Sequence, residues 1–210
     1  MTEGTIYIAT SNAGKLRDFA AAAKLKSVEV LPLPGFSEMP SVAEDGETFE
    51  ANARKKAEHY SRLFPGNLVL GDDSGLEVRA LGGAPGVHSA RFAAEDASLS
   101  GNAPDEANNR KLLSLLASSN DRGAHFVAVI AVAMKGKTLA VFSGQVEGTI
   151  MRAARGTNGF GYDPLFQVEN TEKTMAELSG EEKAAISHRG RAFRRFLEWY
   201  RVQPSGFAKL

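Results

Sequence analysis

The sequence contains no cysteine among its 210 residues. Disulfide bonds, thiolate catalysis and cysteine-ligated zinc are therefore excluded. A cysteine-free chain fits a reducing cytoplasm, although secreted proteins can also lack cysteine. At this length a chain can bury roughly 70% of the surface that it exposes when unfolded, so it needs no covalent staples.

Long apolar runs are also missing. The longest, FVAVIAVAM at residues 126–134, is about half of what a helix needs to cross a bilayer. The N-terminal MTEGTIYIATSN has no basic region followed by a long apolar run, so it predicts a first strand and not a signal peptide. We therefore expect a soluble, cytoplasmic protein with no membrane partner.

The chain has no excess of either charge, because 25 Lys and Arg residues balance 25 Asp and Glu residues. Proteins that bind long nucleic acids usually carry a basic excess. The balance argues against a long nucleic acid as partner. It leaves room for a small anionic ligand held by a few well-placed cations.

Repeats, low-complexity tracts and linkers are absent as well, so we expect a single domain over residues 1–210 with a loose tail at about 203–210. The expected strands alternate with helices, and the later strands form a hairpin, which predicts an α/β fold with a mixed sheet. The strands are expected at residues 6–10, 27–31, 68–70, 125–134 and 138–150. The main helices are expected at residues 48–64 and 105–116 and from residue 187 onward.

The first candidate site is the segment that joins the first expected strand to a helix: Thr10, Ser11, Asn12, Ala13, Gly14 and Lys15. Backbone N–H groups at a helix start attract phosphate, and the polar side chains add donors. The P-loop pattern is absent. Taken alone, the segment is more typical of simple helix capping by Ser11 or Asn12.

Acidic residues form the second candidate. Asp72 and Asp73 follow the short strand at 68–70 and precede Gly75, which predicts that they lie at the end of that strand. Magnesium prefers carboxylate oxygens, and a carboxylate can take a proton from an attacking water. An Asp-rich turn would give the same pattern. Glu44 is a possible second ligand, although the Asp-Gly pair after it is an ordinary turn signal.

Two further segments carry possible ligand-binding groups. Glycines in the loop at 156–164 let the backbone approach a ligand, and Phe160 or Tyr162 could stack on a base or pack in the core. Donors suited to a purine carbonyl cluster near the C-terminal helices, where they could also merely complement a helix dipole: Lys183, Ser187, His188 and Arg189. Lys56 belongs to a basic run that is usually just a solvated helix face.

The order of these segments resembles the inosine triphosphatase (HAM1-like) family over about residues 5–197. The resemblance rests on TSNAGK, EDGETFEANARKKA, GDDSGLEV, GGAPGVHSARF, GTNGFGYDPLF and AELSGEEKAAISHRGRA. It implies hydrolysis of ITP, dITP and XTP to the monophosphate and pyrophosphate, which cleanses the nucleotide pool. It also implies a homodimer, a long mixed sheet flanked by helices, and a substrate cleft between two lobes.

The resemblance assigns roles to individual residues. Magnesium, one ion or more per site with manganese as a possible substitute, is expected on Glu44 and Asp73. Asp73 is also the expected catalytic acid, and Asp72 supports it. Substrate contacts are expected from Thr10 to Lys15, Lys56 and Ser74 for the phosphate side, and from Phe160, Gly161, Tyr162, Asp163, Lys183, His188 and Arg189 for the base. Hypoxanthine and xanthine carry a carbonyl at position 6, which suits such donors, whereas adenine would leave them unmet. How guanine is rejected does not follow from the sequence.

The sequence departs from the family pattern in three places: a long polar segment at 97–106, His125 where we expect Arg, and an extended tail.

Two rival functions remain. A Maf-like pyrophosphatase acting on other bases is opposed by GFGYDP and SHRG. A nucleotide-binding module without turnover is opposed by the joint presence of Asp72, Asp73, Glu44 and Lys15.

Overall fold

The computed structural model describes residues 5–24, 29–94 and 101–203, and these are built around a six-stranded sheet. The strand order is β2-β1-β3-β4-β5-β6. The strands are β1 (Ile6–Ile8), β2 (Val30–Pro32), β3 (Val69–Val78), β4 (Gly123–Met134), β5 (Lys137–Ile150) and β6 (Phe166–Val168). β1 pairs in parallel with β2 and β3, and the other pairs are antiparallel. This mixed sheet confirms the predicted α/β fold.

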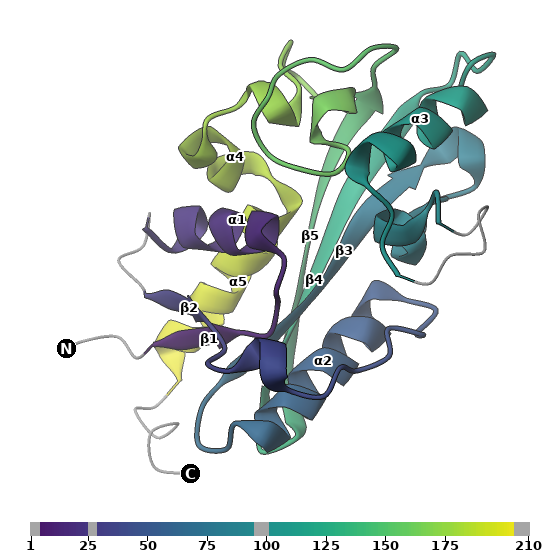
Figure 1. Cartoon of the computed structure of the whole chain (residues 1–210). Coiled ribbons are helices and arrows are strands. Elements are labelled where there is room, and N and C mark those ends of the chain that lie inside the picture. The colour runs from purple at the N-terminus through teal and green to yellow at the C-terminus, as the bar shows by residue number, and fades with distance from the viewer. Residues whose placement is uncertain (1–4, 25–28, 95–100, 204–210) are drawn as a thin grey trace.

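Helices cover both faces of the sheet (Figure 1). They are α1 (Ala13–Lys24), α2 (Phe49–Leu63), α3 (Asp105–Leu115), α4 (Gly180–Ile186) and α5 (His188–Val202). Ile130 of β4 packs with α1 and α5, whereas its neighbour Val129 packs with α2. Because neighbouring side chains of a strand point to opposite faces, α2 and α5 lie on opposite sides of the sheet.

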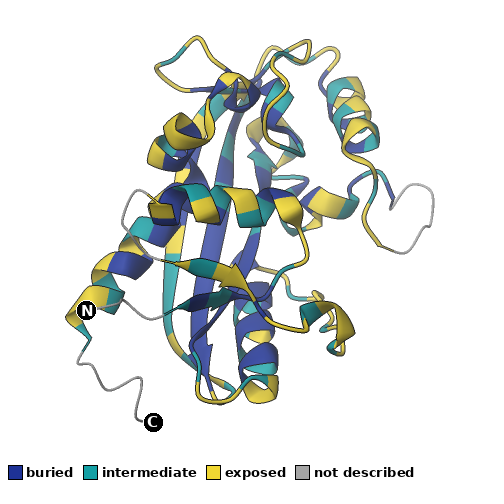
Figure 2. Cartoon of the chain, turned by 60° about the vertical axis from the view of Figure 1, so that its left-hand side comes forward, coloured by how far each residue is buried: buried dark blue, intermediate teal, exposed yellow. Residues whose placement is uncertain are grey.

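The core divides along the length of the strands. One cluster joins β1 and the adjoining half of β3 and β4 to α1 and α5, with Phe193 and Phe196 at its centre. Another cluster lies around the other half of β3 and β4 and includes Leu76 and Phe126. Figure 2 shows buried residues along the central strands and exposed ones on the outer faces of the helices. The long strands β3 and β4 therefore contribute residues to both clusters.

Side-chain caps and a hairpin account for several of the observed elements. The Thr48 hydroxyl caps α2 by accepting a bond from Ala51 N, and Ser179 forms a capping box with Glu182 ahead of α4. The predicted hairpin is β4 and β5. β2 is displaced towards Pro32 from the predicted strand at 27–31, whose first two residues fall outside the described part. Residues 204–210 of the predicted tail and residues 97–100 of the long polar segment also lie outside the described residues.

The predicted end of the third strand at Leu70 is wrong. β3 continues to Val78, and Asp72 and Asp73 pair with Ile130 and Val129 of β4. Gly71, directly after Leu70, allows β3 to pack closely on α2. A Cβ on Gly71 would lie 2.4 Å from the carbonyl oxygen of Ala53 in α2. The two acids therefore project from the middle of a rigid strand, on opposite faces.

No helix within the described ranges, 5–24, 29–94 and 101–203, combines the length and apolarity needed to cross a membrane.

Candidate functional site

A cleft of about 490 Å³ lies between the segment before α1, the middle of β3, the loop before β6 and the start of α5. This volume lies in the range of small-molecule sites, roughly 300–1,000 Å³. Most of the predicted site residues line it: Thr10, Ser11, Asn12, Lys15, Glu44, Lys56, Asp72, Asp73, Ser74, Phe160, Gly161, Tyr162, Asp163, His188 and Arg189. Ala13, Gly14 and Lys183 are not among its lining residues. The fold thus gathers distant sequence segments around one cavity.

The segment before α1 is both a helix cap and part of the cleft. Asn12 Oδ1 accepts a hydrogen bond from Lys15 N at 3.0 Å, and Thr10 Oγ1 accepts one from Asn12 N at 3.1 Å. These bonds fix the turn that begins the helix. The capping role and the ligand-binding role are therefore compatible, because the same turn aims Lys15 into the cleft.

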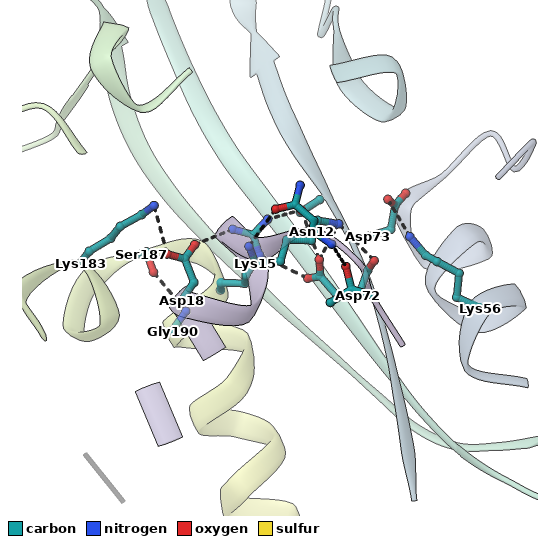
Figure 3. A network of polar contacts seen from close by, with 12 residues as sticks. Asn12, Lys15, Asp18, Lys56, Asp72, Asp73, Lys183, Ser187 and Gly190 are labelled. Atoms are coloured by element: carbon teal, nitrogen blue, oxygen red, sulfur yellow. Dashed lines mark hydrogen bonds and ion pairs between the residues drawn. The ribbon is translucent and has the colours of Figure 1, made fainter. Parts of the chain in front are cut away.

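Asp72 is a buried carboxylate with cations on either side, and Figure 3 shows it beside Lys15. Its Oδ2 lies 2.7 Å from Lys15 Nζ, and its Oδ1 lies 3.6 Å from Arg189 Nε. Burial alone would raise its pKa, but Lys15 and Arg189 hold the pKa of Asp72 well below its usual range. Burial in turn lowers the pKa of Lys15, against the attraction of Asp72. Asp72 is thus a fixed negative charge that positions two cations.

Asp73 lies on the opposite face of β3 in a different environment. Its Oδ1 lies 3.3 Å from Lys56 Nζ, and its Oδ2 accepts a hydrogen bond from Asn52 Nδ2 at 3.1 Å. Burial raises the pKa of Asp73 above its ordinary value, despite the nearby Lys56. A raised pKa makes this carboxylate the better proton acceptor of the adjacent pair.

Lys56 joins Asp73 to Glu44. Its Nζ lies 2.7 Å from Glu44 Oε2 as well as 3.3 Å from Asp73 Oδ1. Burial alone would lower the pKa of Lys56, but Asp73 and Glu44 raise it above its ordinary value. Lys56 is buried and does not lie on a solvated face, because α2 packs closely on β3 at Gly71.

The other end of the cleft holds a buried network of paired charges. Lys183 Nζ lies 2.6 Å from Asp163 Oδ2 and 3.2 Å from Asp18 Oδ1. Arg189 lies 2.8 Å from Asp18 Oδ2 and donates to Ser74 Oγ at 2.5 Å. Burial raises the pKa of Asp163, against Lys183. Each cation of this network already has a carboxylate partner.

Phe160 and Tyr162 take different positions in the glycine-rich loop. Phe160 is half-buried in the cleft wall and packs on the start of α1, where a Cβ on Gly14 would lie 2.3 Å from its ring. Lys183 Nζ and Arg189 Cζ lie 5.1 Å and 5.3 Å from the centroid of that ring. Tyr162 is buried, and its hydroxyl donates to the carbonyl oxygen of Ser89 at 2.8 Å. Phe160 is therefore the better candidate for a stacking platform.

His188 is buried at the start of α5, where its ring stacks on Phe126 at 4.8 Å between centroids. Burial, together with Arg189 and Lys183, lowers the pKa of His188 well below its ordinary value, so the ring is neutral near pH 7. Its Nδ1 has no hydrogen-bond partner among the described residues. His188 lines the cleft, and this nitrogen is buried beneath the cleft surface.

Sequence reasoning missed two residues of the site, Asp18 and Asn52. Asp18 follows Lys15 by one helical turn, and Asn52 precedes Lys56 by one turn. This spacing places both residues of each pair on the same face of a helix. A polar residue one turn from a candidate cation was therefore the signal that could have identified them.

The fold and the cleft together define a class: an α/β protein with a small-molecule site that combines buried cations, two acids on one strand and an aromatic wall. The sequence matches the Ham1 family over residues 6–199, so the chain belongs to this family. The match agrees with the resemblance found in the motifs.

Similar proteins support this membership. The dITP/XTP pyrophosphatase of Acidobacterium capsulatum is 53% identical over 193 residues, covering 90% of this chain and 95% of that protein. The dITP/XTP pyrophosphatase of Syntrophobacter fumaroxidans is 48% identical over 212 residues, covering 98% and 88%. The solved structure of a HAM1 protein from Coxiella burnetii is 38% identical with a TM-score of 0.80, covering 96% of this chain and all of the other.

Proposed function

We infer that this chain hydrolyses non-canonical purine nucleoside triphosphates, namely dITP, ITP and XTP, to the monophosphate and pyrophosphate. The single observation that carries this inference is the placement of Asp73, with its raised pKa, in one cleft with Lys15 and Lys56. The family membership and the relatives named dITP/XTP pyrophosphatase support it. The enzyme is thus a hydrolase of the bond between the α and β phosphates.

The phosphate side of the cleft supplies positive charge where a triphosphate needs it. Lys15 and the segment ahead of α1, with Ser11 and Asn12, line the cleft on one side, and Lys56 lines it on the other. Such groups stabilise the charge that develops as the bond to pyrophosphate breaks. Asp73 orients the attacking water and accepts its proton, whereas Asp72 stays ionised and holds Lys15 in place.

The acids also fit a divalent cation. Glu44 and Asp73 both contact the Lys56 ammonium, so their carboxylates already converge on one positive charge. No group of three or more His, Cys, Asp or Glu side chains suited to a metal occurs in the described part of the chain. Magnesium is commonly held by one or two carboxylates together with substrate phosphates, which suits this pair. When bound, magnesium would neutralise phosphate charge and polarise the reacting phosphate, and manganese could replace it.

The base side of the cleft favours an oxo-purine. Phe160 supplies a ring for stacking, and the neutral ring of His188 lines the same side of the cleft. A carbonyl at position 6 accepts hydrogen bonds from donors that line this side, His188 and Arg189 among them, whereas an amino group leaves those donors unmet, at about 1–3 kcal/mol each. Lys183 and Arg189 hold this side in shape through their ion pairs with Asp163 and Asp18.

The substrate inference is tested by product analysis. Purified protein with magnesium is incubated with dITP, ITP, XTP, GTP, ATP and dTTP, and the products are separated by chromatography. We expect monophosphate and pyrophosphate from the first three, with ATP and GTP largely intact. Strong turnover of dTTP would favour a Maf-like activity instead, and binding of dITP without any product would favour a binding module.

Assembly and location are proposed on the same basis. The family resemblance suggests a homodimer, which sedimentation at several protein concentrations would test. Cleansing of the nucleotide pool suggests a cytoplasmic enzyme, which cell fractionation would test.

A further inference from the structure

Asn52 is a buried polar residue that none of the predicted roles includes. It lies in the first turn of α2 and is 1% exposed. Its neighbours on the same helix face, Phe49 and Ala53, pack into an apolar cluster. A buried amide among apolar side chains is destabilising unless its hydrogen bonds are satisfied. The partners of Asn52 therefore indicate what it does.

The side-chain amide of Asn52 makes three hydrogen bonds. Nδ2 donates to Asp73 Oδ2 at 3.1 Å and to the carbonyl oxygen of Gly46 at 3.3 Å, and Oδ1 accepts from Gly46 N at 2.8 Å. Only one orientation of the amide satisfies all three, because the NH₂ group must face two acceptors and the oxygen must face a donor. Asn52 thus links the backbone of Gly46 directly to the carboxylate of Asp73.

The loop held in this way carries Glu44. Gly46 lies two residues after Glu44, and a Cβ on Gly46 would lie 2.7 Å from Asn52 Oδ1. The close fit leaves the loop little freedom at this point. One helical turn further along α2, Lys56 contacts both Glu44 and Asp73. One face of α2 therefore sets the position of the Glu44 carboxylate and the orientation of the Asp73 carboxylate.

We propose that Asn52 is a positioning residue, which couples the Glu44 loop to Asp73 so that the two carboxylates present their oxygens together to a divalent cation. It acts through these carboxylates and touches neither substrate nor metal. The proposal rests on the proposed function for its catalytic consequence, but the coupling is a property of the protein that metal binding measures directly.

Asn52→Leu tests the proposal, because leucine has a similar size and removes all three hydrogen bonds without adding charge. Asn52→Ser is measured beside it, so that a failure of the leucine variant to fold leaves a second variant. Ser61→Ala is the matched control. Ser61 is also buried on α2, but it lies near the other end of the helix. Its hydroxyl oxygen accepts a hydrogen bond from Gly136 N at 2.9 Å and so holds a turn in place.

The first readout is Mn²⁺ binding by electron paramagnetic resonance, with and without a non-hydrolysable α,β-imido analogue of dITP. Loss of a residue that orients metal ligands typically costs about 10- to 100-fold in metal affinity or activity. We expect a loss of this size in Mn²⁺ affinity for both Asn52 variants. The second readout is turnover of dITP at saturating Mg²⁺, where kcat should fall while KM for dITP changes little.

Wild-type Mn²⁺ affinity in folded Asn52 variants, or a loss no greater than that of Ser61→Ala, would overturn the proposal. A fall in thermal stability alone would assign Asn52 a purely structural role and would overturn it as well. If the wild-type protein hydrolyses none of the nucleotides, the proposed function fails. The Mn²⁺ comparison between Asn52→Ser and the wild type still decides the positioning role in that case.

Discussion

The two ends of the cleft use charge in different ways. At the phosphate end, Lys15 and Lys56 line the cleft, and each contacts an acid of β3. At the base end, Lys183 contacts two carboxylates and lies behind the lining, while the cleft-facing His188 is neutral. The phosphate end thus suits a polyanion, whereas the charged residues that line the base end, Asp163 and Arg189, are paired within the wall.

This difference separates two kinds of effect. Charged side chains that face the cleft stabilise the transition state, in which negative charge develops on the phosphates. Substitutions at the phosphate end should therefore act mainly on turnover and on triphosphate binding. Side chains that form ion pairs within the wall stabilise the fold and hold the shape of the pocket. Substitutions at the base end should therefore act on the stability of the protein and on its affinity for the base. The predictions below test that separation.

The largest effect is expected for Asp73→Asn. Removal of the carboxylate that we propose as the acceptor of the water proton should lower kcat for dITP by about 10²–10⁴-fold. Stability should be kept or increased, because a carboxylate whose pKa is raised by burial is a destabilising charge in the folded state. Single-turnover kinetics and thermal denaturation of the same preparation check both statements, and near-wild-type kcat would remove Asp73 from the mechanism.

Lys183→Met changes the base end of the cleft, and its main effect should be a loss of folding stability. The change leaves Asp163 buried without its ion-pair partner, and such a loss typically costs about 3–5 kcal/mol. Urea denaturation measures it. Replacing both residues, as Lys183→Met with Asp163→Leu, should recover part of the stability, because no uncompensated charge then remains. A single variant as stable as the wild type would mean that the pair does not hold the wall.

Lys15→Met should act mainly on triphosphate binding. A hydrogen bond to a charged group is worth about 1.5–3 kcal/mol, which is roughly a 10- to 150-fold loss of affinity. Deoxyinosine lacks the phosphates and serves as the control ligand in calorimetry with the non-hydrolysable analogue. Equal weakening of nucleoside and triphosphate would contradict the assignment of Lys15 to the phosphate end.

Phe160→Ala should raise KM for dITP without a comparable fall in kcat. Stacking of a base on an aromatic ring is worth about 1–3 kcal/mol. Because Phe160 also packs on Gly14 and lies near Lys183, denaturation must be followed in parallel. An unchanged KM in a folded variant would make Phe160 a packing residue of the wall.

The smallest effect concerns His188 and pH. Burial lowers the pKa of His188 in the folded protein, whereas the unfolded chain has the ordinary value of about 6.5. The unfolded state then binds more protons below that value, so His188 contributes a loss of stability of about 1.4 kcal/mol per pH unit as pH falls below about 6.5. His188→Gln should remove that part of the slope in denaturation curves between about pH 5 and 7. An unchanged slope would mean that His188 is protonated in the folded state.

Sequence and structure agree best where a local pattern decides the outcome. The helix expected at residues 48–64 is observed as α2 (Phe49–Leu63), within a residue at each end. The strand through Asp72 and Asp73 was missed, because Gly-Asp-Asp-Ser-Gly has the composition of a turn. Pairing with β4 and the close approach of α2 at Gly71 outweigh that local tendency.

In the site, too, features that depend on local sequence were predicted, and features that depend on tertiary packing were not. Motif order identified the cleft residues from several distant segments, since those residue types carry the chemistry. Asp18 and Asn52 were missed because their role depends on tertiary partners, Arg189 for the first and Asp73 for the second. Spacing along a helix could suggest these residues, but only the packed structure supplies the atoms that they contact.

The central claim is attack of water at the α phosphate, and hydrolysis in water labelled with oxygen-18 tests it most directly. Mass spectrometry of the products from dITP should find the label in dIMP and none in pyrophosphate. Label in pyrophosphate would place the attack at the β phosphate, and dIDP with labelled inorganic phosphate would place it at the γ phosphate. Either result would contradict the arrangement of Asp73, Lys15 and Lys56 inferred for this cleft.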